Sequence, residues 1–200
     1  MVKDKQKHKQ NLAETKRNLI GSLFDKAFTA LNDGSARSLG IMTLHWRPNE
    51  TVYIIPSSDR VTVIYAIDFV EPEERALAKV FLNEFADTQR TVNNAPPCSF
   101  SPEPPGELAG MQIKERNCVG YISFVMFPQH VAPGQKETCI SLLCGFRNYL
   151  HYHIKCTKTY MLMRMRKRVV SLLQGKTRQD RPPEEEKAQK TAQGKRFSRK

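Results

Sequence analysis

The 200-residue chain lacks an N-terminal apolar segment and any apolar run close to membrane-spanning length. It begins MVKDKQKHKQN, and its richest apolar stretches are interrupted by charged residues or proline. A signal peptide needs an apolar core of about 7 to 15 residues, and a membrane-spanning helix needs about 20 apolar residues. We therefore expect a protein of the cytoplasm or nucleus with no membrane span.

Paired cysteines are also lacking. The five cysteines are an odd number and form no C-x-x-C pair. Without a signal peptide, this pattern argues against a disulfide framework. We expect Cys98, Cys118, Cys139, Cys144 and Cys156 to be reduced thiols in the core or at the surface.

Catalytic motifs are absent as well. There is no Gly-rich phosphate loop, no G-x-S-x-G and no H-E-x-x-H. His153 and Cys156 could share a metal ion, but zinc needs three or four ligands, so packing is the favoured role of this histidine. Lys114 and Arg116 could lower the pKa of the Cys118 thiol, but no partner histidine is evident. We expect no catalytic residue, no metal, no cofactor and hence no enzyme.

The positive charge is unevenly distributed. Residues 155–200 hold 15 Lys or Arg against 4 Asp or Glu, a balance of +11, which leaves +1 of the total of +12 for residues 1–154. A nearly neutral domain therefore ends in a basic segment. Such a segment attracts acidic protein surfaces, nucleic acid or lipid headgroups, and its sign alone does not choose among them.

Hydrophobic periodicity predicts an α+β domain in which helices cover an antiparallel sheet. Helices are predicted at 19–31, from Pro72 to about Asp87, and at 138–174, and strands at 39–46, 51–55, 60–69, 98–101 and 119–127. The first three strands have tight connections typical of a meander, and the strand at 119–127 is apolar on both faces, which indicates an internal position. The order is α-βββ-α-ββ-α, ending in one long C-terminal helix.

This pattern divides the chain into four segments. Residues 1–10 offer nothing to bury and should be disordered or a frayed helix start. The α+β domain follows at 11–137 and the long helix at 138–174, and a charged tail occupies 175–200. About 55 Å of helix exceeds what this domain needs to cover its own sheet, so part of it is expected to bind something outside the chain.

The long helix carries two apolar stripes about 100° apart. The first comprises Ile140, Leu143, Leu150, Ile154, Met161, Met165 and Leu172, and the second comprises Leu142, Phe146, Tyr149, His153 and Tyr160. Two stripes predict two packing partners, the sheet and another protein, without indicating which stripe faces which. The alternative is a single core helix with one broad apolar face.

The remaining sector of this helix is polar and increasingly basic. It holds Asn148, His151, Lys155, Lys158, Thr159 and Arg166, and the run Arg164, Arg166, Lys167 and Arg168 continues it. A basic run alone is most often a solvated helix face. Its position at the end of a neutral domain favours a docking surface, and no aromatic interleaving or module signature of a nucleic-acid binder accompanies it.

Several blocks of the sequence resemble one family, that of actin-related protein 2/3 complex subunit 2. They are RVTVIYAIDF at 60–69, KVFLNEF at 79–85, VGYISFVMFPQH at 119–130, FRNYLHYHIKCTKTYMLMRMR at 146–166 and GKRFSR at 194–199. Family members usually carry a further α/β domain ahead of this one. Since the chain here begins MVKDKQKHK, we expect a naturally short variant or an incomplete gene model.

The resemblance implies a non-catalytic scaffold of the complex that nucleates branched actin filaments, in the cytoplasm and cytoskeleton. It implies that the long helix pairs with the helix of subunit 4, beside other subunits of the complex, and that the pair touches the actin filament. The implied actin-contact candidates are Lys155, Lys158, Arg164, Arg166 and Arg168. The rival hypothesis is a nucleic-acid-binding module that uses the basic helix and tail.

Overall fold

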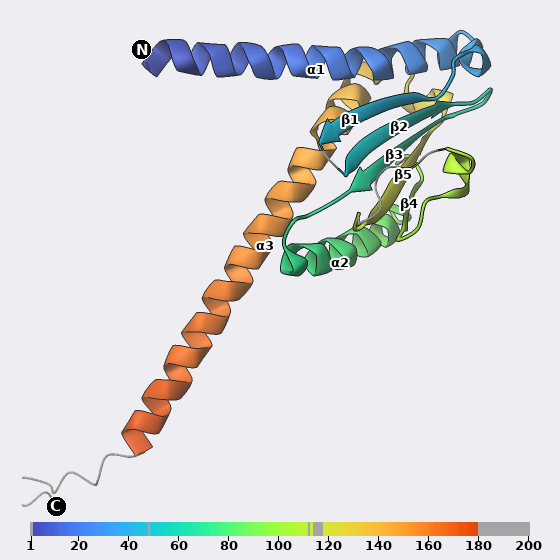
Figure 1. Cartoon of the computed structure of the whole chain (residues 1–200). Helices are drawn as coiled ribbons and strands as arrows, with labels where there is room; N and C mark the ends of the chain where they lie inside the picture. The colour runs from blue at the N-terminus through green and yellow to red at the C-terminus, as the bar shows by residue number, and fades with distance from the viewer. Residues whose placement is uncertain (1, 48, 112, 114–117, 180–200) are drawn as a thin grey trace, which may run out of the picture. The chain divides into compact units, whose positions relative to one another are not determined.

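A computed structural model describes residues 2–47, 49–111, 113 and 118–179. The chain divides into two compact units, Met1–Lys158 and Thr159–Lys200. The helices are α1 (Val2–Asn32), α2 (Pro72–Gln89) and α3 (Lys136–Gln179), and the strands are β1 (Met42–Arg47), β2 (Glu50–Pro56), β3 (Val61–Ile67), β4 (Cys98–Ser101) and β5 (Gly120–Met126). Short 3-10 turns, η1 (Ala36–Ser38), η2 (Gly106–Leu108) and η3 (Pro128–His130), lie between them. The α+β class and the predicted order are confirmed (Figure 1).

The five strands form one antiparallel sheet in the order β1-β2-β3-β5-β4. The first three strands are the predicted meander, with Leu44 opposite Val52 and Val52 opposite Tyr65. Strand β5 pairs with β3 on one side and with β4 on the other. Both of its edges are therefore satisfied, which agrees with the internal position that its continuous apolar sequence indicated.

Apolar side chains cover both faces of the sheet. One face, with Val63, Tyr65 and Phe124, shares a core with residues from all three helices. The other face, with Ile64 and Tyr121, packs under the segment around η2. Because successive strand residues point to opposite faces, β3 serves both cores, and all of its residues are buried and all except Thr62 are apolar.

Helix α1 is longer than the periodicity of the sequence indicated. Its last turns bury Phe24, Ala27, Phe28 and Leu31 against the sheet. It begins at Val2, within the stretch for which the sequence offered disorder or a frayed helix start. It ends at the predicted stop, where Gly34 has a φ of 73°, a conformation that glycine adopts without a steric penalty.

The first turns of α3 are fixed by contacts to the rest of the domain. The Lys136 Nζ atom lies 2.6 Å from a carboxylate oxygen of Asp25 on α1. The buried Tyr65 hydroxyl on β3 donates a 2.9 Å hydrogen bond to the carbonyl of Leu143. These contacts orient one side of α3 toward the sheet, and they begin two residues before the predicted helix start.

Candidate partner-binding surface

The first apolar stripe of α3 is buried along its N-terminal half. Ile140, Leu143, Leu150 and Ile154 belong to the core shared with the sheet, and Leu150 and Ile154 are almost completely inaccessible to solvent. This part of the stripe therefore faces the sheet, a question that the sequence left open.

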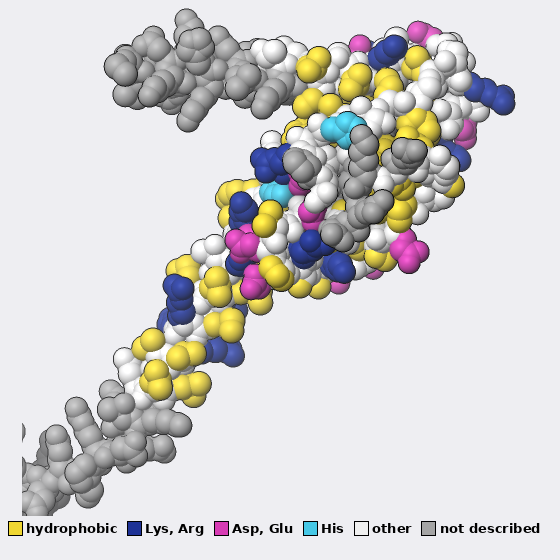
Figure 2. All heavy atoms as spheres, viewed as in Figure 1, with side chains coloured by type: hydrophobic (Ala, Val, Ile, Leu, Met, Phe, Trp, Pro, Cys, Tyr) yellow, Lys and Arg dark blue, Asp and Glu magenta, His cyan; other side chains and the backbone are white. Residues whose placement is uncertain are grey.

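The same stripe is exposed farther along the helix. Met161, Met165 and Leu172 expose 46%, 61% and 71% of their surface. Between Thr159 and Gln174 every residue of α3 is exposed. The stretch nevertheless contains Leu162, Met163, Val169, Val170 and Leu173 in addition to the three residues above. Figure 2 shows hydrophobic side chains gathered along this part of α3, interleaved with Lys and Arg. An exposed concentration of this kind marks a surface for a partner.

The second stripe is divided between core and surface within the domain. Phe146 is buried and His153 is half-buried, whereas Leu142 and Tyr149 expose 70% and 50% of their surface. Tyr160, the next member of the stripe, is also exposed. An exposed leucine and tyrosine two turns apart on one helix face form a ridge that a second helix can pack against.

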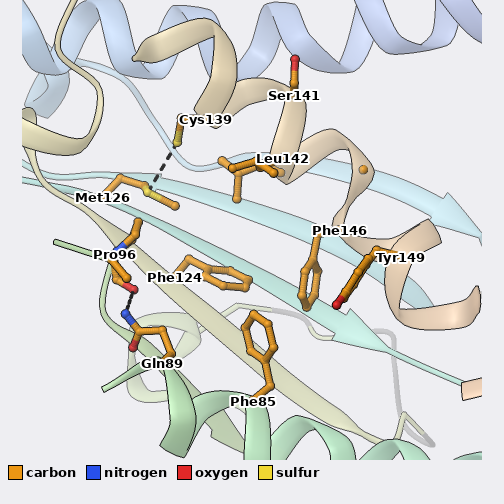
Figure 3. Close-up of a pocket in the computed structure, with 13 residues that line it drawn as sticks. Phe85, Gln89, Pro96, Phe124, Met126, Cys139, Ser141, Leu142, Phe146 and Tyr149 are labelled. Carbon is orange, nitrogen blue, oxygen red and sulfur yellow. Dashed lines mark hydrogen bonds between the residues drawn. The ribbon is translucent and has the colours of Figure 1, made fainter. Parts of the chain in front are cut away.

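An apolar hollow of about 470 Å³ lies beside this ridge. Figure 3 shows Leu142, Phe146 and Tyr149 of α3 on one side of it, with Phe85 of α2 and Phe124 of β5 opposite. The ring centroids of Phe124 and Phe146 are 5.0 Å apart with the planes nearly perpendicular, the favoured edge-to-face geometry. A rigid aromatic floor beneath exposed apolar side chains can receive apolar side chains from a partner.

The Gln89 amide, at the edge of the hollow, already has hydrogen-bond partners within the chain. Gln89 of α2 donates a hydrogen bond to the carbonyl of Pro96 and accepts one from the backbone N–H of Cys98. A half-buried amide that is hydrogen-bonded through both its nitrogen and its oxygen offers little to a polar ligand. The hollow is therefore suited to apolar contact and not to acid–base chemistry.

The basic candidates on α3 lie in different environments. Lys155, Arg164, Arg166 and Arg168 are exposed. The guanidinium carbon of Arg164 lies 5.6 Å from the centroid of the Tyr160 ring, within the range of a cation–π contact. These exposed cations can meet an acidic surface without any rearrangement of the core.

Lys158 is engaged within the domain. Its ammonium group pairs with Glu71 and lies 3.7 Å from Glu73 and 3.9 Å from Glu74, all at the start of α2. The lysine side chain is only 22% exposed. An actin contact by Lys158 would have to compete with this acidic cluster.

A buried ionic cluster was not anticipated from the sequence. The Arg147 Nε atom lies 2.5 Å from one carboxylate oxygen of Glu50, and the His151 Nε2 atom lies 3.0 Å from the other. The His151 ring also stacks on Phe69, with the centroids 4.2 Å apart. His151 was placed in the polar sector of this helix, and in the structure its ring is half-buried between Glu50 and Phe69.

The spacing of Arg147 relative to the apolar residues of α3 could have indicated that its side chain is buried. Arg147 follows Leu143 by four residues and precedes Ile154 by seven, which places it on the buried stripe. Burial alone would raise the pKa of the Glu50 carboxyl, but hydrogen bonds from His151 and Arg147 outweigh burial and hold the pKa below its usual value. The carboxylate is therefore a structural anchor between β2 and α3.

The remaining expectations concern metals, thiols and membranes. Within the described ranges, no group of three or more His, Cys, Asp or Glu side chains could hold a metal ion. Cys98 and Cys144 are buried, and burial raises the pKa of the Cys98 thiol to about 12. Lys114 and Arg116, the expected neighbours of Cys118, lie outside the described residues. None of the helices in the described part of the chain is long and apolar enough to cross a membrane.

Comparisons with known proteins show which sequences this chain resembles. A family model described as "Arp2/3 complex, 34 kD subunit p34-Arc" matches residues 1–180. The chain is similar to "Actin-related protein 2/3 complex subunit 2" of Schizosaccharomyces pombe, with 36% identity over 216 residues that cover 98% of this chain and 68% of the relative. It is also similar to the protein of the same name from Dictyostelium discoideum, with 38% identity over 162 residues that cover 80% of this chain and 54% of the relative. The chain thus spans between about half and two thirds of the length of these relatives, and the resemblance found in the sequence blocks is confirmed.

Proposed function

We propose, on the premise that this chain belongs to the family of the Arp2/3 complex 34 kD subunit p34-Arc, that it is a non-catalytic scaffold subunit of that complex. In this role it supports the nucleation of branched actin filaments in the cytoplasm, as part of the cytoskeleton. The hydrophobic core, the buried ionic cluster and the apolar hollow contribute to folding and docking, and none of them offers a nucleophile beside a base.

One observation supports the proposed contact with a partner helix. Leu142 and Tyr149 are exposed on α3 beside an apolar hollow, while the opposite stripe of the same helix is buried in the core. A helix with one stripe in its own core and a second stripe uncovered is suited to pairing with a second helix. We assign this face to the long helix of subunit 4, and we assign the exposed Met161 and Met165 of the first stripe to the same partner.

The exposed basic residues are assigned to the filament. Arg164, Arg166 and Arg168 are on the surface of α3 with no acidic partner among the described residues. Actin is acidic, so such cations would contribute long-range attraction and exposed ion pairs. Each pair is worth about 1 kcal/mol or less and weakens as salt shortens the Debye length.

A triple variant tests the filament contact. The complex carrying Arg164→Ala, Arg166→Ala and Arg168→Ala should assemble normally, co-sediment less with filaments at low salt and approach the parent at high salt. A matched control replaces Arg37, Lys79 and Arg90, three exposed basic residues outside α3, and should leave filament binding unchanged. If both triple variants bind filaments like the parent while the α3 variant loses binding to duplex DNA or RNA, the nucleic-acid hypothesis replaces this one.

A further inference from the structure

A second hollow, of about 700 Å³, lies on another side of α3. Its walls come from α1 at Leu19 and Ile20, from four consecutive residues of β1, Leu44 to Arg47, and from α3 around Arg147 and Asn148. Leu142 and Tyr149 of the ridge assigned to the partner helix do not line it, although Ser141 and Gly145 of α3 line both hollows. Neither the core packing nor the proposed function uses it.

A buried arginine with an unused donor forms part of its wall. Arg147 is 95% buried, and its Nε atom donates to Glu50. Its Nη2 atom is buried and has no hydrogen-bond partner in the described chain. An unsatisfied buried donor costs about 1 to 3 kcal/mol, so an acceptor supplied from outside would recover free energy that the isolated domain lacks.

A β-bulge brings a second arginine to the same side of the sheet. His45 pairs with Thr51, but the next pair is Arg47 with Glu50, so Trp46 is an extra residue in β1. Directly opposed residues of antiparallel strands point to the same face. The bulge therefore turns Arg47 to the face of Glu50, which is also the face that Arg147 covers, and bulges often re-aim side chains in this way.

The net positive charge of the hollow would be balanced by a ligand with a single negative charge. Arg147 is neutralised by Glu50, and no acidic side chain is among the residues that line the hollow. Arg47 is exposed and has no ion-pair partner within the described ranges. With histidine counted as neutral, the described lining residues together with Glu50 carry a net charge of +1, which is the charge of Arg47. A carboxylate would be compensated by this charge, whereas a phosphate dianion would not.

Apolar side chains form the rest of the walls of the hollow. They indicate which kind of chemical group would lie next to a bound carboxylate. Ile20, Leu44 and the indole of Trp46 are part-buried against the core, and Leu19 is 67% exposed at the rim. Exposed rim residues make this an open groove, whereas the alkyl chain of a fatty acid needs an enclosed apolar cavity. The groove suits a peptide segment that lies along the surface.

We propose that this hollow binds an extended segment of a partner protein that presents one Asp or Glu side chain next to a large apolar side chain. The carboxylate lies between Arg47 and Arg147 and accepts the unused hydrogen bond of Arg147. The neighbouring apolar side chain packs against Trp46 and Leu19.

The sole tryptophan of the chain, Trp46, reports on binding directly. The full-length chain at micromolar concentration is titrated with the capped peptide Gly-Ser-Leu-Glu-Leu-Ser-Gly while tryptophan emission is recorded. Two matched peptides carry Gln in place of Glu, or Ala in place of both Leu residues. We expect saturable binding of the first peptide and dissociation constants about tenfold higher for the other two, because each loses one class of contact.

Variants of the chain distinguish peptide binding in this hollow from general electrostatic attraction between the peptide and the chain. Arg47→Ala should remove the preference for Glu over Gln, whereas Arg37→Ala, an exposed arginine outside the hollow, should keep it. Leu19→Ala should weaken the Leu peptide and leave the Ala peptide unchanged. Equal binding of the Glu and Gln peptides would overturn the proposal. Displacement by inorganic phosphate or by dodecanoate at lower concentration than by the peptide would overturn it in favour of a phosphate or a lipid.

Discussion

Glu50 is a buried carboxylate at the start of β2 whose two partners lie 97 and 101 residues farther along the chain. Removing the carboxylate leaves the Arg147 guanidinium buried without its counter-ion, and breaking a buried ion pair costs about 3 to 5 kcal/mol. Glu50→Gln retains an acceptor for Arg147, so we expect a loss near the lower end of this range. Urea denaturation at neutral pH measures it.

The pH dependence of this loss is set by the lowered pKa of Glu50. A carboxyl with a lowered folded-state pKa stabilises the fold above its unfolded pKa, about 4.3 for Glu, and this stabilisation is lost as the pH falls toward the folded value. The difference in unfolding free energy between the parent and Glu50→Gln should shrink as the pH falls below about 4.3. A difference that does not change down to about pH 3 would contradict the assigned role.

Gly120 at the start of β5 is required by a close approach of β4. A Cβ atom at this position would lie 2.7 Å from the Ser101 carbonyl oxygen and 2.6 Å from the Phe100 ring. Because the backbone oxygen cannot move away cheaply, Gly120→Ala should destabilise the fold by about 1 to 3 kcal/mol. Gly40→Ala is the control, since its Cβ would meet nothing within 4 Å. Comparable melting temperatures for the two variants would show that β4 can shift without cost.

Individual residues were the least predictable part of the molecule. The Lys and Arg of α3 form one basic run in the sequence, yet Lys158 pairs with the start of α2 and Arg164 does not. The pairing depends on α2 lying beside α3, and no local pattern encodes that neighbour. For the same reason the pairing of His151 with Glu50 was not predictable, although the sector that holds His151 was expected to be polar.

Elements were predicted well where periodicity was strong. The strands and α2 lie within a few residues of their predicted bounds, since β-branched runs and turn residues are local signals. The orientation of α3 was not predictable, because both stripes are apolar and only contacts such as Tyr65 to Leu143 determine which one is buried. The first turns of α1 lack apolar periodicity, so the sequence did not decide between disorder and a frayed helix start there.

Gly145 in α3 provides a prediction at the scale of the element. Glycine inside a helix costs about 1 kcal/mol relative to alanine, and a Cβ at this position would meet nothing within 4 Å. Gly145→Ala should therefore raise the unfolding free energy of the isolated chain by about that amount. If a partner backbone approaches this position, the same variant should bind that partner more weakly. Chemical denaturation and a binding titration with subunit 4 measure the two effects, and unchanged or stronger binding would remove close approach as the reason for the glycine.

At the scale of the whole molecule, one long helix combines folding and docking. Its buried stripe completes the core of the domain, whereas its other side and its residues from Thr159 to Gln174 remain exposed. An exposed apolar surface of this kind promotes self-association. The chain alone should therefore form concentration-dependent oligomers, and subunit 4 should convert them to a heterodimer by covering the same surface.

Sedimentation velocity of the chain co-expressed with subunit 4 tests this account most directly. The parent should form a stable heterodimer, and Leu142→Asp, which places a charge on the exposed ridge, should abolish it while the domain still unfolds cooperatively. Val80→Asp, a matched exposed position on α2, should pair like the parent. A Leu142→Asp chain that forms the heterodimer as tightly as the parent, or a parent chain that stays monomeric at tens of micromolar without subunit 4, would contradict the assignment of this face to a partner helix.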